Sequence, residues 1–102
     1  MSFVKAAKSN EVKERFSKAV VIDNRKIALF RYQGIVYALR NFCLHQGAPI
    51  SDGFAKDGHA VCPHHGWSFS LETGAFINND KLKLKTYPVK EKDGYIYIET
   101  GD

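Results

Sequence analysis

Short apolar segments that alternate with polar residues recur along the first 40 residues, and turn-forming pairs separate them. Residues 19–22 and 26–32 flank the pair at 23–24, and residues 35–39 follow the pair at 33–34. Their β-branched and aromatic residues are typical of strands, and the Asp, Asn and Gly between them favour tight turns. The pattern therefore predicts an antiparallel meander.

The C-terminal part of the chain shows the same pattern of short alternating segments separated by turn-forming residues. Residues 81–85 alternate strictly between Lys and Leu, which suits an edge strand whose charged face discourages pairing with other molecules. Residues 88–91 and 95–98 flank Asp93-Gly94, a strong signal for a hairpin. We expect these segments to complete the sheets.

The N-terminal segment is predicted to add one strand and one short helix. The strand is expected at residues 3–6. Ser9 and Asn10 can then cap one or two helical turns, in which Val12 and Phe16 lie four residues apart and face inward together.

The composition changes between residue 41 and about residue 69, where Gly, Pro, His and Cys follow one another at short intervals. Within this stretch residues 58–61 read as a strand, and the sheet resumes at 67–71. We predict an all-β chain with an antiparallel β-sandwich base, into which a loop-rich subdomain at about residues 41–70 is inserted. Because no repeat or linker divides the sequence, residues 1–102 are predicted to form one domain.

Composition is consistent with a globular chain, since 44% of the residues are hydrophobic and 25% are charged. No apolar run approaches the ~20 residues that a membrane-spanning helix needs. The first residues also lack the pattern of a secretory signal. We therefore expect a cytoplasmic protein that does not bind membranes.

The net charge of +4 is unevenly distributed. Residues 1–40 hold nine Lys and Arg against three Asp and Glu, whereas residues 41–80 hold one against four. The lysines are scattered over predicted strands without an aromatic-interleaved basic stripe, so we expect no nucleic-acid binding. The acidic middle segment, with Asp52 and Asp57, is instead expected to contact a protein partner.

Two short motifs in that segment carry metal-ligating side chains. Cys43-Leu44-His45 is followed, after sixteen residues, by Cys62-Pro63-His64-His65, and the two cysteines in them are the only ones in the chain. Each motif offers one thiolate and one imidazole, whereas zinc fingers place both cysteines before both histidines. A tetrahedral zinc site remains an alternative, and so does a disulfide between the cysteines, although a cytoplasmic location disfavours the disulfide.

The two motifs, read as C-x-H and C-x2-H, resemble those of small bacterial Rieske-type ferredoxins, and further shared segments cover about the last two thirds of the chain. These segments are Gly47-Ala48-Pro49, Gly66-Trp67-Ser68-Phe69, Thr73-Gly74, Thr86-Tyr87-Pro88-Val89 and residues 93–98. The resemblance implies a Rieske fold with one [2Fe–2S] cluster. It further implies that Cys43 and Cys62 bind one iron, while His45 and His65 bind the other.

The remaining histidines fit the motif less well. His64 lies one residue too early for the C-x2-H spacing and is kept as an alternative ligand. His59 is expected to be an ordinary polar residue of a strand. Close to the motifs, Gly47, Gly53 and Gly66 are expected to permit tight turns and close backbone approach beside the cluster. Trp67 is expected to anchor the second loop.

The chain lacks several residues that raise the reduction potential in the high-potential members of the family. Those members carry an additional disulfide and a serine beside the cluster, whereas this chain has Ala48 and His64 in place of the cysteines and Trp67 in place of the serine. Fewer donors to sulfur stabilise the reduced cluster less, so we expect a potential near the low end of the family range, about −150 mV. Phe76 or Ile77 is expected to cover the cluster.

Apart from these motifs, the sequence offers no facial triad, phosphate loop or nucleophile with a base, so we expect an electron-transfer protein and not an enzyme. The resemblance implies a monomeric carrier similar to the ferredoxin components of ring-hydroxylating dioxygenases. Such a carrier takes electrons from a flavin-dependent reductase and delivers them to a terminal oxygenase. The alternative is a protein similar to the small Rieske-type subunit of assimilatory NAD(P)H nitrite reductase.

Overall fold

The computed structural model describes residues 3–43, 48–63 and 66–100. Over these ranges the chain forms twelve strands and two short 3-10 helices, which confirms the all-β prediction. In chain order the elements are β1 (Val4–Lys8), η1 (Ser9–Glu11), β2 (Ser17–Ile22), β3 (Arg25–Tyr32), β4 (Ile35–Arg40), η2 (Ile50–Asp52), β5 (Phe54–Lys56), β6 (His59–Val61), β7 (Ser68–Ser70), β8 (Ala75–Phe76), β9 (Asn79–Lys83), β10 (Thr86–Tyr87), β11 (Val89–Lys92) and β12 (Tyr95–Ile98).

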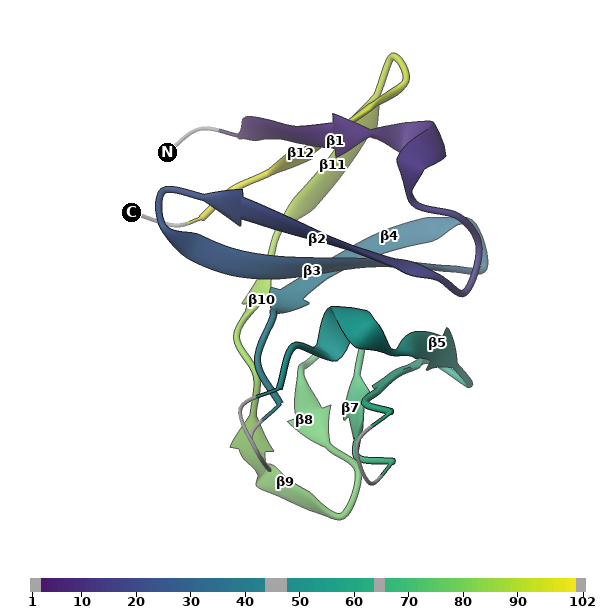
Figure 1. The fold of residues 1–102 in the computed structure, drawn as a ribbon, viewed down its shortest axis with the longest axis vertical. Helices are drawn as coiled ribbons and strands as arrows, with labels where there is room; N and C mark the ends of the chain where they lie inside the picture. The colour runs from purple at the N-terminus through teal and green to yellow at the C-terminus, as the bar shows by residue number, and fades with distance from the viewer. Residues whose placement is uncertain (1–2, 44–47, 64–65, 101–102) are drawn as a thin grey trace.

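The strands form three sheets, and the ladders between named strands are antiparallel. A three-stranded sheet has the order β1-β12-β11, a four-stranded sheet the order β10-β4-β3-β2, and a five-stranded sheet the order β5-β6-β7-β8-β9. Figure 1 shows the four-stranded sheet in the middle, with the three-stranded sheet above it and the five-stranded sheet below. The inserted part predicted from the sequence lies in this lower layer, and β8 and β9 complete its sheet.

Strand β3 is buried on both faces, and successive side chains alternate between two hydrophobic cores. Ile27 and Leu29 belong to what we call the upper core, while Ala28 and Phe30 belong to the lower core. All four side chains are 0% exposed. The continuous apolar run of this strand therefore serves two layers. The upper core also contains Val12, Val36, Ala38, Tyr87, Ile96 and Ile98, and the lower core Leu39, Cys43, Ile50, Cys62, Phe69, Phe76 and Leu84.

Tight turns fix the register of the hairpins as the sequence predicted. The pairs at 23–24, 33–34 and 93–94 all have positive φ at both residues, the geometry that suits two-residue hairpin loops. Asp57 and Gly58 form a fourth turn of this kind, with φ of 51° and 77°, between β5 and β6. Strands β5, β8 and β10 were not predicted from the sequence.

The prediction for the N-terminal segment was partly wrong. A single 3-10 turn replaces the expected α-helical turns, and the chain leaves it at Val12 in an extended conformation, with φ −115° and ψ 100°. Val12 is buried as expected, but Phe16 is 63% exposed, because the segment between them is not helical and turns at Arg15, which has a φ of 70°. The Val12 carbonyl accepts a hydrogen bond of 2.7 Å from Arg31 Nε.

Strand β9 is an edge strand, as predicted from its lysines. It ends the order of its sheet, and its five residues are exposed. The strand begins two residues earlier than expected, and the buried residue, Leu84, follows its end. Among the described residues, no helix has the length and apolar character needed to cross a membrane.

Candidate metal centre

The two cysteines of the predicted metal site lie in one buried cluster of side chains. Cys43 comes shortly after β4 and is 1% exposed, and Cys62 follows β6 and is 0% exposed. Both belong to the lower core. Neither takes part in a disulfide, as the metal interpretation requires. The fold therefore brings the sulfur atoms of both motifs into the same layer of the molecule.

The predicted histidine ligands lie outside the described residues. This holds for His45 and His65, and also for the alternative ligand His64. The assembly of two cysteines and two histidines around one centre is therefore a prediction, whereas the placement of the two cysteines is observed.

The two cysteines begin loops that are closed in the same way. The backbone N–H of Cys43 donates a hydrogen bond of 2.7 Å to the carbonyl of Ala48. The N–H of Cys62 likewise donates to the carbonyl of Trp67, also at 2.7 Å. Each loop thus joins a cysteine to the residue five positions later, and each contains one of the predicted histidine ligands.

Asn41 fixes the start of the first loop to η2. Its side-chain amide donates to Ser51 Oγ at 2.8 Å, and its side-chain carbonyl accepts from the Ser51 N–H at 2.9 Å. The Ser17 hydroxyl donates to the Ser51 carbonyl at 2.5 Å, which ties η2 to strand β2. Asn41 is only 8% exposed, so these bonds are protected from water. Sequence reasoning missed Asn41 and Ser51, because single polar residues next to a motif carry no spacing signal.

The second loop is the tip of a hairpin between β6 and β7, in which Val61 pairs with Ser68. Gly66 in this loop has a φ of 71°, a left-handed conformation that glycine adopts without strain. The tight turn expected there is confirmed. Gly47, for which the same was expected in the first loop, lies outside the described residues.

Gly53 holds the chain after η2 close to the start of the second loop. A Cβ atom on Gly53 would collide with the carbonyl oxygen of Val61 and lie 3.1 Å from Pro63 Cδ. The position therefore needs glycine for close approach of two backbones, although its own φ of −101° is open to any residue. Close packing here joins the segments that follow and precede the two cysteine loops.

Aromatic stacking supports the second loop from the side of β8. The ring of Trp67 stacks on that of Phe76 with centroids 4.0 Å apart and an interplanar angle of 9°. Phe69 lies tilted against Phe76 at 5.7 Å and against Trp67 at 6.3 Å. The expected anchoring role of Trp67 is confirmed. Of the two residues expected to cover the cluster, Phe76 is 8% exposed and Ile77 is 59% exposed.

His59 behaves as an ordinary polar residue of a strand, as predicted. It lies in β6 and is half-buried, and its Nδ1 is 2.8 Å from the carbonyl oxygen of Asp57. This contact is local, since it joins residues two positions apart.

The described part of the site fits an iron–sulfur centre. Cysteine side chains bind metal ions as thiolates, and paired cysteine and histidine side chains are the donors of iron–sulfur centres of mixed ligation. Two cysteines lie in one core, at the bases of two matching loops. The sequence of these loops supplies the imidazoles of His45 and His65 as the predicted remaining donors, and this mixed set of sulfur and nitrogen suits two irons.

The chain is similar to proteins of known function and structure. Residues 2–88 match the family model described as the Rieske [2Fe-2S] domain. Over 78 residues the chain is 46% identical to the 3-phenylpropionate/cinnamic acid dioxygenase ferredoxin subunit of Photorhabdus laumondii, with 74% of each chain covered. It is also similar to the solved structure of a Sphingomonas yanoikuyae ferredoxin, with a TM-score of 0.85, 29% identity, and 97% and 99% of the two chains covered.

Longer proteins contain a similar unit. The chain is 34% identical to the oxygenase component of dicamba O-demethylase from Stenotrophomonas maltophilia over 116 residues. This match takes in 100% of the present chain but 34% of that protein, so the chain spans about a third of the length of this relative.

Proposed function

The chain belongs to the Rieske [2Fe–2S] domain family, and from this membership we propose that it is a one-electron carrier and not an enzyme with a substrate of its own. A [2Fe–2S] cluster is the cofactor of this family, and the chain carries one. The bound cluster supplies a redox couple that takes up and releases a single electron. The structural observation that supports the proposal most directly is the burial of Cys43 and Cys62 in one core, at the bases of two identically closed loops.

We propose that Cys43 and Cys62 bind one iron and that His45 and His65 bind the other. The cysteines are buried and exclude water from their side of the site. Asn41 and Gly53 position the loops, the first through its paired hydrogen bonds to Ser51 and the second by allowing close backbone contact.

We also propose that residues 1–102 act as a single Rieske domain. The subdomain at about residues 41–70 carries both ligand motifs, and the middle sheet separates it from the upper core. This arrangement gives the cluster-binding loops a rigid base, which keeps the ligands in place as the charge of the centre changes.

The proposed partners are a flavin-dependent reductase as the electron donor and a terminal oxygenase as the acceptor, with the chain acting as a monomer. Support for this comes from the relatives, since the Photorhabdus protein is a ferredoxin subunit of a dioxygenase. The dicamba relative favours a different role, because a similar unit there forms about a third of an oxygenase component. The two roles differ in whether the chain delivers electrons to a separate protein.

Metal analysis and electron transfer together test the carrier proposal. Purified protein is expected to contain two irons and two acid-labile sulfides per chain, and no zinc. After reduction by dithionite, its electron paramagnetic resonance spectrum should give an average g value below two, as expected from mixed histidine and cysteine ligation. Given a flavin reductase and NADH, the protein should pass electrons to cytochrome c. A colourless protein with one zinc ion would contradict the proposal.

The nitrite reductase subunit remains the second candidate. A solved structure described as a putative small subunit of NADPH nitrite reductase has a TM-score of 0.87 but 23% identity, so this likeness extends to the fold alone. The electron-transfer assay separates the candidates. A free carrier supports transfer from the reductase to cytochrome c by itself, whereas obligate co-purification with a sirohaem protein would favour the subunit.

A further inference from the structure

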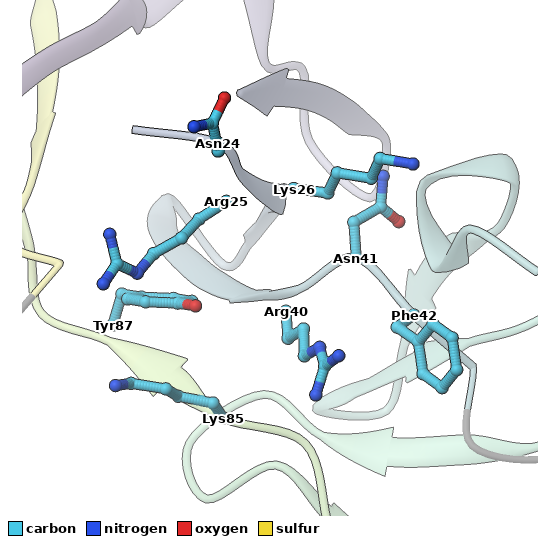
Figure 2. Close-up of a pocket in the computed structure, with 8 residues that line it drawn as sticks. All are labelled: Asn24, Arg25, Lys26, Arg40, Asn41, Phe42, Lys85 and Tyr87. Atoms are coloured by element: carbon cyan, nitrogen blue, oxygen red, sulfur yellow. The ribbon is translucent and has the colours of Figure 1, made fainter. Parts of the chain in front are cut away.

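A basic cleft lies beside the first cysteine loop. It has a volume of about 470 Å³, and four of its lining residues are the cations Arg25, Lys26, Arg40 and Lys85. Among the described residues that line it there is no carboxylate. In the view of Figure 2, Arg25 and Lys85 lie on either side of the Tyr87 ring, Arg40 lies between Tyr87 and Phe42, and Lys26 lies near Asn41.

Strand pairing brings the cations together from three distant segments of the sequence. The N–H of Arg40 donates to the carbonyl of Lys85 at 2.8 Å, and the N–H of Asn41 donates to the carbonyl of Lys26 at 2.9 Å. Like charges on neighbouring strands repel each other. Within the described parts of the chain, Lys26, Arg40 and Lys85 take no part in the ion pairs of Lys18 with Glu11 and of Arg31 with Glu91, so these carboxylates do not offset their charge. A negatively charged group over the cleft would relieve this repulsion.

Aromatic rings hold two of the cations at the wall of the cleft. The guanidinium of Arg40 lies 5.0 Å from the centre of the Phe42 ring, and Lys85 Nζ lies 5.5 Å from the centre of the Tyr87 ring. Such contacts stabilise cations without neutralising them. The charge therefore remains available to a ligand.

The cleft also adjoins the candidate metal centre. Phe42 lines the cleft, is 37% exposed and directly precedes Cys43, the residue that begins the first loop. A molecule seated over the cleft thus contacts the residue next to a proposed iron ligand. For an electron carrier this is a useful position, since electron transfer requires a short distance between redox centres.

We propose that this cleft docks an acidic surface segment of a redox partner protein, in place of the docking through Asp52 and Asp57 that the sequence led us to expect. The proposal rests on the carrier function proposed above. A protein segment fits better than a small anion, because the side chain of Asn41, the buried polar residue of the lining, is already bonded to Ser51. The remaining polar groups of the lining form a broad cationic surface, which favours electrostatic docking over a closed pocket.

The test uses the oxidised holoprotein and a hexaglutamate peptide with blocked ends as the probe. Amide chemical shifts are followed by NMR during titration at low salt and again at 0.3 M salt. The double variant Arg40→Glu/Lys85→Glu removes the basic surface. The matched control is Lys13→Glu/Lys92→Glu, which changes the net charge equally at exposed positions away from the cleft. Inorganic phosphate and hexathymidylate are titrated in parallel.

We expect the peptide to shift amides at residues 25–26, 40–42 and 85, with binding weakened at least tenfold by the cleft variant and less than twofold by the control. Added salt should weaken binding to the native protein. Equal weakening by both variants would overturn the proposal, as would phosphate binding as tight as that of the peptide. Tighter binding of hexathymidylate would also overturn it, in favour of nucleic acid. Iron and sulfide content are measured on every variant, so that loss of the cluster, which counts against the carrier function, is distinguished from loss of docking.

Discussion

Asn41 and Ser51 are joined by two hydrogen bonds, one in each direction, and this pair connects the strand before the first cysteine loop to the helix that follows it. The donor and the acceptor of the Asn41 amide are both used. Because the pair is mostly buried, removal of either partner leaves polar groups without partners in a place that water does not readily reach.

Replacement of Asn41 by alanine is expected to reduce the free energy of unfolding by about 1–3 kcal/mol, since it leaves the Ser51 N–H unsatisfied. It should also make the visible absorption of the cluster decay faster, because the first loop loses its tie to η2. Ser51→Ala keeps the backbone bond and is expected to have a smaller effect on both quantities. Denaturant unfolding and the rate of bleaching in air measure the two effects. Equal effects of the two variants would show that the Asn41–Ser51 backbone bond is unimportant.

The four histidines of the chain provide a matched series for the proposed iron ligands. His45→Ala and His65→Ala are each expected to abolish the visible absorption and lower the iron content, because a cluster iron loses a ligand. His59→Ala should leave both unchanged, since His59 makes a local contact to Asp57. His64→Ala distinguishes the alternative ligand: retained iron in this variant assigns the role to His65, and loss of iron would give it to His64.

Gly53 and Gly58 separate the effect of collision from that of backbone strain. Gly53→Ala places a Cβ against the Val61 carbonyl, so the free energy of unfolding is expected to fall by more than about 2 kcal/mol. At Gly58, which has a φ of 77°, a Cβ meets nothing within 4 Å. Gly58→Ala should therefore cost only about 1 kcal/mol of left-handed strain. Denaturant unfolding of both variants is the measurement, and the reverse order of costs would contradict the close packing described for Gly53.

Neighbouring residues Phe76 and Ile77 differ in burial and provide another comparison. Phe76→Ala is expected to reduce the free energy of unfolding by about 3–4 kcal/mol, because the buried ring stacks on Trp67. Ile77→Ala should change it by less than about 0.5 kcal/mol, since that side chain is mostly exposed. The reduction potential is measured for Ile77→Ala and for Phe76→Leu, which keeps a buried apolar side chain at position 76. A larger shift of the reduction potential for Ile77→Ala than for Phe76→Leu would identify Ile77 as the residue that covers the cluster.

Stability in acid should depend on the ion pair between Glu91 and Arg31, whose closest atoms are 2.7 Å apart. The hydrogen bonds from Arg31 hold the pKa of Glu91 below its ordinary value of 4.5. Because the pKa is lower in the folded state, the contribution is complete above about pH 4.5 and is lost as the pH falls through the folded pKa.

Glu91→Gln is therefore expected to cost about 1 kcal/mol at pH 7 and less in acid, a modest value because the Glu91 side chain is 31% exposed. Glu72→Gln, at an exposed position without an ion pair to the described residues, is the control. The difference in unfolding free energy between each variant and the native chain is compared at pH 7 and pH 4. A difference for Glu91→Gln that grows toward acid would contradict the assignment.

Local sequence rules predicted the parts of the fold that local chemistry determines. The turns at residues 23–24, 33–34 and 93–94 follow from residues that tolerate positive φ, and their strands follow from alternation. Strands β5, β8 and β10 were missed because they have three, two and two residues, too few for a period to be recognised, although Asp57-Gly58 carried the same turn signal. Phe16 was misplaced because a helical period was assumed for a segment that leaves the 3-10 turn at Val12 and turns again at Arg15.

The candidate site likewise has parts that the sequence predicted and parts that it did not. Spacing alone identified Cys43 and Cys62, and the structure places both in one core. The bonds of Asn41 to Ser51, and the cleft built from residues 25–26, 40 and 85, depend on which strands pair. That information arises from tertiary packing, and a pattern along the chain does not contain it.

The separation of the hydrophobic interior into two cores by β3 has a consequence for protein engineering. Substitutions at Ile96 or Ile98, in the upper core, share no core cluster with Cys43 or Cys62. Changes at distant positions without shared neighbours combine additively. Heat tolerance and redox behaviour can therefore be adjusted in separate libraries and merged afterwards, provided that β3, the wall common to both compartments, is left intact.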